Sequence, residues 1–360
     1  MPPSTFSRCD RDEFHVALSA DFLDDQGQMA FPDLGLSLLD HVPGLSYSFL
    51  QDYRAEYLPD QLKDCDVLIS LKPRVTAASL DGIERLCAIG RCGVGYDNVD
   101  LPSCTAHGIA VFITPQGVVR PVAEAIVLYV LALSHGLVRK DRLVREGKWV
   151  ESTKPLGREP RDRVIGSIGL GGIASEAVRL LKPFGPADFL AFDPYVNENH
   201  ARKLGVRMVS LDQLLSASDY VLVNCPLTPE TRGLIGEREL SLMKRDAVLI
   251  NTARGPIVQE QALIRALDAG QIGGAALDVF EKEPLDRDSP LTGMQNVILS
   301  SHSIAWTEEL FRDMGRTDCD GALTVWRGEA PPHVVNREVL TRPEFLRKLE
   351  RYRATQAVNR

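Results

Sequence analysis

"SIGLGGIAS", residues 167–175, is the stretch of this 360-residue chain that most clearly indicates the fold of its second half. It closes the short apolar run "VIGSIGL" (164–170) and leads into the helical pattern "SEAVRLLKPFG" (175–185). A glycine-rich turn between a strand and a helix is the setting in which a dinucleotide pyrophosphate is bound. The helix N-terminus offers free N–H groups and partial positive charge to the phosphates.

Each small residue of this turn has a physical task. Gly169 makes the tight turn, Gly171 lets the backbone approach the pyrophosphate, and Ala174 allows close packing of strand and helix. The pattern therefore predicts a cofactor site at Gly169, Gly171, Gly172 and Ile173.

An acid follows at the expected distance. The next strand candidate, "DFLAFD" (188–193), ends in Asp193, and 193 − 169 = 24 residues, close to the spacing of about 20 for the acid that binds the ribose hydroxyls. A carboxylate here repels a 2′-phosphate, so NAD (NADH) is favoured over NADP. The alternative is a surface acid in the turn "DPY".

Short apolar runs alternate with helical stretches along the whole chain, which predicts an α/β fold with parallel sheets. In the second half six runs match a doubly wound sheet. They span residues 164–170, 188–193, 220–226, 247–252, 274–280 and 297–301. In the first half the strand candidates are 15–20, 47–51, 66–71, 86–90 and 109–114, with a helix expected over 79–86 and Ser79 as its N-cap.

Composition narrows the class of protein. Hydrophobic residues make up 44% and charged residues 25%, as in soluble globular proteins, and the net charge of −8 predicts no nucleic-acid or anionic-membrane partner. The seven cysteines (9, 65, 87, 92, 104, 225 and 319) lack metal-ligand spacing. They favour reduced thiols, no metal site and a cytoplasmic location. The longest apolar stretch, 123–137, contains Glu124, is too short to span a bilayer and is expected to be a buried helix.

Three later strand candidates are each followed by a residue of catalytic type: Arg254, Glu283 and His302. The carboxyl ends of parallel strands share one edge of a sheet, so we expect these side chains to lie near the cofactor. Reduction of a carbonyl needs a proton donor, which suits His302, and a carboxylate such as Glu283 stabilises the protonated imidazole. A guanidinium binds a substrate carboxylate through two hydrogen bonds, which suits Arg254.

Each residue also has an ordinary structural interpretation. Arg254 alone is a helix-start cation, Glu283 a solvated loop acid and His302 a loop histidine; their convergence on one sheet edge favours the catalytic hypothesis.

The sequence resembles the D-isomer-specific 2-hydroxyacid dehydrogenases over about residues 65–325. The matching blocks come in the family's order. They are "GRCGVGYDNVD" (90–100), "TPQGVVRPVAE" (114–124), "GLGGIA" (169–174), "NCPLTPETRGLI" (224–235), "LINTARGPIVQEQALIRAL" (249–267), "GGAALDVFEKEPL" (273–285) and "SSHSIAW" (300–306).

The resemblance implies two Rossmann-like domains. Residues 1–118 and 306–360 would form a split, flavodoxin-like substrate domain, and residues 119–305 an NAD-binding domain inserted into it. It also implies a homodimer formed through the cofactor domain, and a small 2-keto or 2-hydroxy acid as substrate.

The resemblance assigns roles residue by residue. It gives the catalytic triad as Arg254, Glu283 and His302, and the substrate-carboxylate loop as the backbone N–H groups of Val94 and Gly95 together with Arg254. On the cofactor it places Asp193, Cys225, Pro226, Thr231, Thr252, Ala253 and Asp278, the last on the carboxamide.

Three features depart from the family or extend it. Gly172 replaces a frequent Arg, which removes one pyrophosphate contact. Trp306, in a segment unlike the family's usual one, either shapes the substrate pocket or packs in a hinge helix. Lys72 and Arg74 in "LKPRVT" either point inward and bind a second anionic group or are solvated, and solvation is favoured for Arg74.

The function expected is hydride transfer between NAD(H) and C2 of a small keto acid, with His302 as proton donor. Alternatives are an NAD(H)-binding corepressor-like scaffold without turnover and a phosphite dehydrogenase, which shares this triad. A formate dehydrogenase is disfavoured because the family's formate enzymes have Gln in place of Glu283.

Overall fold

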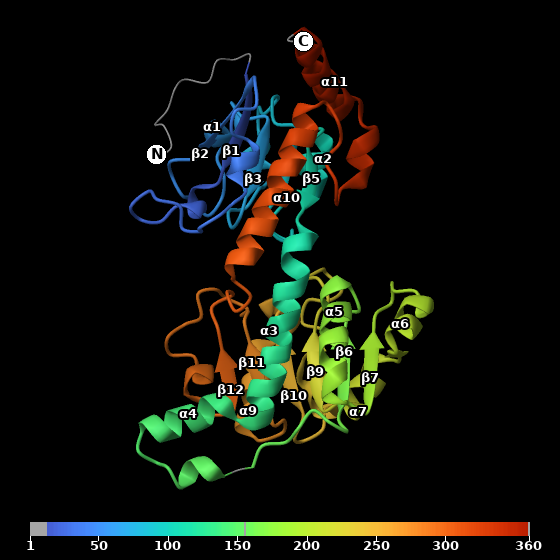
Figure 1. The fold of residues 1–360 in the computed structure, drawn as a ribbon. Coiled ribbons are helices and arrows are strands. Elements are labelled where there is room, and N and C mark those ends of the chain that lie inside the picture. The colour runs from blue at the N-terminus through green and yellow to red at the C-terminus, as the bar shows by residue number, and fades with distance from the viewer. Residues whose placement is uncertain (1–12, 155, 359–360) are drawn as a thin grey trace. The chain divides into compact units, whose positions relative to one another are not determined.

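The computed structural model describes residues 13–154 and 156–358, with side chains described up to residue 354. The chain divides into two compact units. One contains the residues before Val119 together with those from Thr307 onward, and the other contains Val119–Trp306. Both units are parallel sheets covered by helices, as Figure 1 shows, so the predicted α/β fold is confirmed.

The first unit has a five-stranded sheet in the order β2-β1-β3-β4-β5, and every neighbouring pair is parallel. This is the flavodoxin-like order. The strands are β1 (Phe14–Leu18), β2 (Leu45–Phe49), β3 (Val67–Ser70), β4 (Ala88–Arg91) and β5 (Ala110–Ile113), close to the predicted runs. The helices are α1 (Pro59–Leu62), α2 (Leu101–Ala106), α10 (Glu308–Trp326) and α11 (Pro343–Val358).

The helix predicted over residues 79–86 is wrong. The chain forms only a short 3-10 helix, η3 (Ala78–Leu80), and then turns at Gly82, whose φ of +69° is left-handed. Leu80, Ile83 and Leu86 are buried in the core from an irregular loop. Ser79 is buried and accepts a hydrogen bond from the Thr76 N–H, so it caps no α-helix.

The second unit has a seven-stranded parallel sheet in the order β12-β11-β10-β9-β6-β7-β8. The six predicted strands are β6 (Val164–Ile168), β7 (Asp188–Phe192), β9 (Tyr220–Val223), β10 (Val248–Asn251), β11 (Gly274–Leu277) and β12 (Val297–Leu299). The seventh, β8 (Arg207–Met208), is an edge strand of two residues, too short to show a periodic pattern. Strand order reverses between β6 and β9, which makes this the point where such sheets bind ligands.

Helices bury both faces of this sheet, and alternate residues of each strand face opposite layers. Tyr220 and Leu222 of β9 pack with α3 (Pro115–His135), α5 (Gly172–Leu181) and α6 (Glu198–Leu204). Val221 and Val223 pack with α7 (Leu211–Ala217), α8 (Glu237–Leu242) and α9 (Glu260–Asp268). In Figure 1, α3 and α5 lie on the same face of the sheet.

Helix α3 is 21 residues long, and by length and composition it could cross a membrane. The apolar stretch 123–137 thus lies largely within a helix that begins eight residues earlier. Its Ala123, Ile126, Tyr129 and Val130 are nevertheless fully buried in the core of the second unit, as expected of a core helix. Helix α3 ends before Gly136, whose φ of +61° is left-handed, and α4 (Leu137–Arg145) begins directly after it.

The described cysteines are free thiols. Cys65, Cys87, Cys92, Cys104 and Cys319 are buried and Cys225 is partly buried, while Cys9 lies outside the described residues. Burial raises the pKa of Cys225 to about 11, which keeps this thiol protonated at neutral pH.

Candidate active site

The turn between β6 and α5 has room on the side where a ligand would lie. Gly169 has a φ of +94°, and a Cβ there would come within 2.9 Å of the Asn224 and Cys225 backbone. A Cβ on Gly171 would have no atom within 4 Å, so the turn leaves open space at this residue. The first N–H groups of α5 have no intrahelical acceptor, so the turn fits a pyrophosphate.

Around this turn, Gly172 and Ile173 begin α5, and Ala174 is buried where helix and strand pack. A side chain at position 172 would meet only Val119, at 3.3 Å from the Cβ. Little in the fold therefore excludes a larger residue at Gly172.

Asp193 is bound to the turn. Its Oδ2 accepts the Leu170 N–H at 2.9 Å, and its Oδ1 accepts the N–H groups of Tyr195 and Val196 at 2.9 and 3.2 Å. Asp193 is therefore not the simple surface acid of the alternative interpretation. Its carboxylate is held beside the glycine turn. A carboxylate accepts about four hydrogen bonds, so it retains capacity for a ribose hydroxyl.

The loop after β9 adjoins the same turn. Cys225 lies next to Gly169, and the Thr231 hydroxyl donates to the Pro226 carbonyl at 2.6 Å while accepting the Thr228 N–H at 2.8 Å. The Thr231 side chain therefore shapes this loop, whatever contact it makes with a ligand.

Arg254 is held at the end of β10 by a close approach between two loops. A Cβ on Gly255 would lie 1.9 Å from the Phe280 backbone, so only glycine lets the Arg254 loop reach the loop that carries Glu283. Asn251 accepts the Ala253 N–H at 3.0 Å and donates to the Arg254 carbonyl at 3.0 Å, which fixes the backbone beside Thr252.

His302 and Glu283 form a hydrogen-bonded pair. His302 Nδ1 lies 2.8 Å from Glu283 Oε2, and Glu283 Oε1 accepts the Phe280 N–H at 3.1 Å. Because a carboxylate only accepts, Nδ1 carries the proton of this bond. The sequence prediction that these two side chains meet at one sheet edge agrees with this geometry.

The charge on Glu283 is stabilised. Burial raises its pKa, but the His302 hydrogen bond and charge, the Phe280 N–H and the Arg254 guanidinium outweigh burial and hold the pKa of Glu283 below its ordinary value. Arg254, Glu283 and His302 therefore interact within the second unit, although they are 29 and 19 residues apart along the chain.

Asp278 follows β11 and is 6% exposed. Its Oδ1 accepts the N–H groups of Ser303 and Ile304, at 3.0 and 3.2 Å, and the Ser300 hydroxyl at 2.5 Å. Within the described residues no partner is found for Oδ2, which remains for the carboxamide contact that the family resemblance implies.

Lys72, Val94 and Gly95 belong to the first unit. The Val94 and Gly95 N–H groups donate no hydrogen bond within residues 13–154 and 156–358. Their loop is anchored by Thr114, whose hydroxyl accepts the Gly93 N–H at 2.7 Å and whose N–H donates to the Gly93 carbonyl at 3.0 Å. Two free donors on an anchored turn are suited to an anion.

Lys72 and Arg74 are exposed, and the Lys72 N–H donates to Asp21 at 3.0 Å. Trp306, which ends the second unit, is 42% exposed, and its N–H donates to the Ser303 carbonyl at 2.9 Å.

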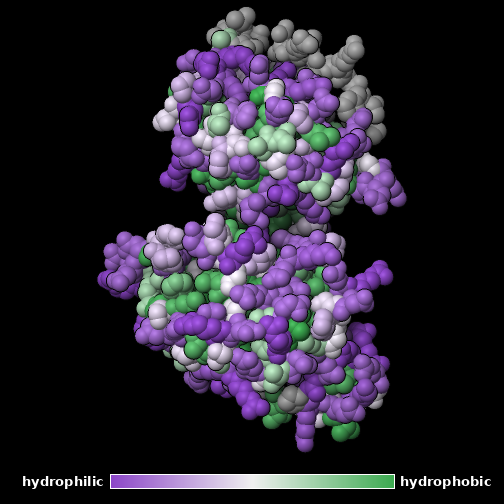
Figure 2. Space-filling view, turned by 180° about the vertical axis from the view of Figure 1, so that it is seen from behind, coloured by the Kyte–Doolittle hydropathy of each residue, from purple (hydrophilic) through white to green (hydrophobic). Residues whose placement is uncertain are grey.

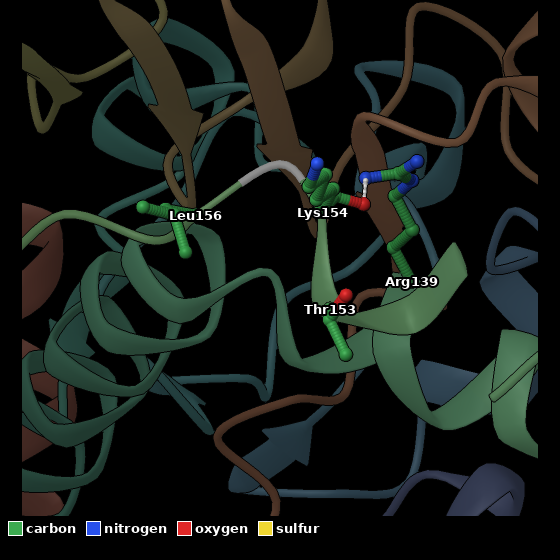
Figure 3. Close-up of a pocket in the computed structure, with 4 residues that line it drawn as sticks. All are labelled: Arg139, Thr153, Lys154 and Leu156. Carbon is green, nitrogen blue, oxygen red and sulfur yellow. Dashed lines mark hydrogen bonds between the residues drawn. The ribbon is translucent and has the colours of Figure 1, made fainter. Parts of the chain in front are cut away.

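An open pocket on the second unit contains none of these residues. Arg139, Thr153, Lys154 and Leu156 line it, and Arg139 donates to the Lys154 carbonyl at 2.9 Å (Figure 3). In the described part of the chain, no group of three or more His, Cys, Asp or Glu side chains is placed to hold a metal ion.

Sequence reasoning missed Gly255 and Thr114. Neither is a catalytic type of residue, and the close approaches that require them appear only in the folded chain. A glycine directly after Arg254 was the one signal in the sequence.

Comparison with known proteins identifies the family. The model of the D-isomer specific 2-hydroxyacid dehydrogenase NAD-binding domain matches residues 127–303. A glyoxylate reductase from Korarchaeum cryptofilum is 38% identical over 285 residues, covering 78% of this chain and 86% of that protein. A D-3-phosphoglycerate dehydrogenase from Archaeoglobus fulgidus is 36% identical over 81% of this chain, which spans only 55% of that relative.

The folds also agree. The NADPH-dependent glyoxylate/hydroxypyruvate reductase from Sinorhizobium meliloti, solved with NADP and malonate, has a TM-score of 0.76 at 27% identity, covering 90% of this chain and 97% of that one. With its glycine turn, its ordered blocks and these relatives, the chain belongs to the D-isomer-specific 2-hydroxyacid dehydrogenase family.

Proposed function

We propose that the protein interconverts a small 2-keto acid and the corresponding D-2-hydroxy acid, with His302 as the proton donor. The observation that carries this proposal is the 2.8 Å contact of His302 Nδ1 with Glu283, beside the Arg254 guanidinium, in the unit that carries the dinucleotide turn. A nicotinamide cofactor bound at that turn supplies or accepts the hydride.

The pair defines where the proton moves. Glu283 fixes the tautomer that carries a proton on Nδ1, so Nε2 is the nitrogen that gives a proton to the developing alkoxide and recovers it in the reverse reaction. The imidazolium is stabilised by Glu283, whose lowered pKa keeps it ionised. Arg254 binds the substrate carboxylate and polarises the neighbouring carbonyl.

For the first unit we propose that the free N–H groups of Val94 and Gly95 bind the carboxylate of the substrate. Lys72 would bind a second anionic group if the substrate has one, and Trp306 would contact its side chain.

We propose NAD rather than NADP as the cofactor. Asp193 is a fixed carboxylate at the end of β7, and its charge opposes a 2′-phosphate on the adenosine ribose. The Sinorhizobium enzyme is NADPH-dependent, so membership of the family does not decide the preference, and the proposal of NAD rests on Asp193.

We also propose a homodimer formed through the second unit, in a reducing compartment such as the cytoplasm. The segment from α4 through η4 (Glu151–Thr153), together with Leu156 shortly after it, exposes several apolar side chains: Leu137, Val138, Val144, Trp149, Val150 and Leu156. Trp149 is 70% exposed. Figure 2 shows one face of the molecule, which is mainly hydrophilic with some hydrophobic patches. Trp149→Glu should convert a dimer to a monomer in sedimentation velocity; a wild-type protein that sediments as a monomer would refute the dimer.

Steady-state oxidation of NADH with a panel of 2-keto acids tests the function. Turnover with at least one, including glyoxylate, hydroxypyruvate, phosphorylated and dicarboxylic acids, is expected. NADH binding without turnover of any keto acid would support a non-catalytic scaffold, and NAD reduction by phosphite would support a phosphite dehydrogenase.

A further inference from the structure

The backbone of His302 is held in a left-handed conformation. Its φ is +56°, a left-handed value that a residue with a Cβ rarely adopts. Such a conformation persists only where the surroundings hold it. The imidazole is therefore placed by contacts on both sides of residue 302.

Asp278 makes those contacts. Its backbone carbonyl accepts the His302 N–H at 2.7 Å, and its Oδ1 accepts the Ser303 and Ile304 N–H groups at 3.0 and 3.2 Å. One buried residue thus binds three successive N–H groups of the loop that carries the proton donor. The Ser300 hydroxyl, at 2.5 Å, completes the contacts of Oδ1.

Tyr129 orients this carboxylate through Ser300. The Tyr129 and Ser300 hydroxyls are hydrogen-bonded. Ser300 has one proton and gives it to Asp278, so it accepts from Tyr129, and the chain runs from Tyr129 to Ser300 to Asp278 Oδ1. Burial raises the pKa of Tyr129 to about 12, so this hydroxyl keeps its proton and remains a donor at neutral pH.

We propose that Tyr129 and Ser300 are positioning residues for His302. Ser300 donates to Oδ1 and Tyr129 orients Ser300, so together they hold the loop and leave Asp278 Oδ2 for the carboxamide of the cofactor. One carboxylate thereby links the nicotinamide to the proton donor. The proposal rests on the function proposed above. It adds to the site Tyr129 of α3, which is 171 residues from Ser300 along the chain.

Tyr129→Phe tests this link, with Tyr220→Phe as its matched control. Tyr220 is equally buried in the same cluster and its hydroxyl bonds to Ser134 at 2.6 Å, so Tyr220→Phe also removes one buried tyrosine–serine hydrogen bond, but none that leads to His302. Tyr129→Phe should lower kcat for keto-acid reduction roughly tenfold to a hundredfold and leave the Kd for NADH within about threefold. Tyr220→Phe should change kcat by less than about threefold.

A second readout does not depend on turnover. Amide hydrogen exchange of residues 300–306 should speed up at least about tenfold in Tyr129→Phe and in Ser300→Ala, and Ser300→Thr should restore the wild-type rate. Ser301→Ala, which removes an exposed hydroxyl of the same loop, should not alter exchange.

The outcomes separate the two proposals. Wild-type exchange in Tyr129→Phe and Ser300→Ala overturns the positioning role, whether or not the enzyme turns over. Equal loss of kcat in Tyr129→Phe and Tyr220→Phe also overturns it, because the effect is then general destabilisation. Absence of turnover in the wild type overturns the proposed function, while the exchange rates still report on the network.

Discussion

We predict that Asp318→Asn stabilises the first unit by an amount that grows with pH. Asp318 lies in α10 and is fully buried. Burial raises its pKa to about 8 from an ordinary 3.8, while the Cys92 thiol and the Arg91 guanidinium oppose the rise. The folded protein therefore contains a neutral carboxyl at pH 7 where the unfolded chain has a charged one.

The sign and size follow from proton linkage. Between pH 3.8 and about 8 the folded state binds one more proton at Asp318 than the unfolded state, so the free energy of unfolding falls as pH rises, by about 1.4 kcal/mol per pH unit. Asn imitates the neutral acid and does not titrate. Its advantage should be about 2 kcal/mol at pH 5, about 4 kcal/mol at pH 7 and on the order of 6 kcal/mol above pH 9.

Urea unfolding at pH 5, 7 and 9 measures this difference. Samples equilibrated in urea receive a hydrogen-exchange pulse at one fixed pH, and peptides from α10 report the midpoint for the first unit alone. Asp320→Asn is the control, because Asp320 is an exposed acid of the same helix. A constant offset from the new amide leaves the pH dependence intact. A stability difference that stays flat from pH 5 to 9 would refute the buried neutral acid.

Four further substitutions address the second unit. His302→Ala should lower kcat for keto-acid reduction roughly 10²- to 10⁴-fold with NADH binding retained; near-normal turnover rejects the proton donor. Arg254→Ala should lower kcat/KM for the keto acid at least about 10²-fold, and an unchanged value removes Arg254 from the site. Asp193→Ala should raise the ratio of kcat/KM with NADPH to that with NADH; an unaltered ratio shows that specificity lies elsewhere. Gly255→Ala places a Cβ 1.9 Å from the Phe280 backbone. The free energy of unfolding of the second unit should therefore fall by roughly 1–3 kcal/mol or more, which lowers its Tm. A wild-type Tm would contradict the close approach.

Much of the candidate site could be predicted because its residues follow apolar strands of a parallel sheet. Such strands are buried on both faces and read as short apolar runs, and the carboxyl ends of these runs locate Asp193, Arg254 and His302 on one edge. The glycine turn marks β6 as the first strand of the second unit along the chain. Edge and loop elements could not be predicted in this way. Strand β8 has only two residues, too few for a pattern. The apolar residues after Ser79 are buried although they lie in a loop, in which Gly82 makes a turn.

From the sequence alone come the class of fold, the dinucleotide turn and the expectation that Arg254, Glu283 and His302 converge, because these depend on local periodicity and on residue type at strand ends. How His302 is held becomes visible only in the folded chain, through its left-handed backbone, the three donors on Asp278 Oδ1 and the hydrogen bond that Tyr129 of α3 makes with Ser300. Tyr129 and Ser300 are 171 residues apart. No local pattern encodes a hydrogen bond between them, because it depends on how a buried helix packs against a sheet.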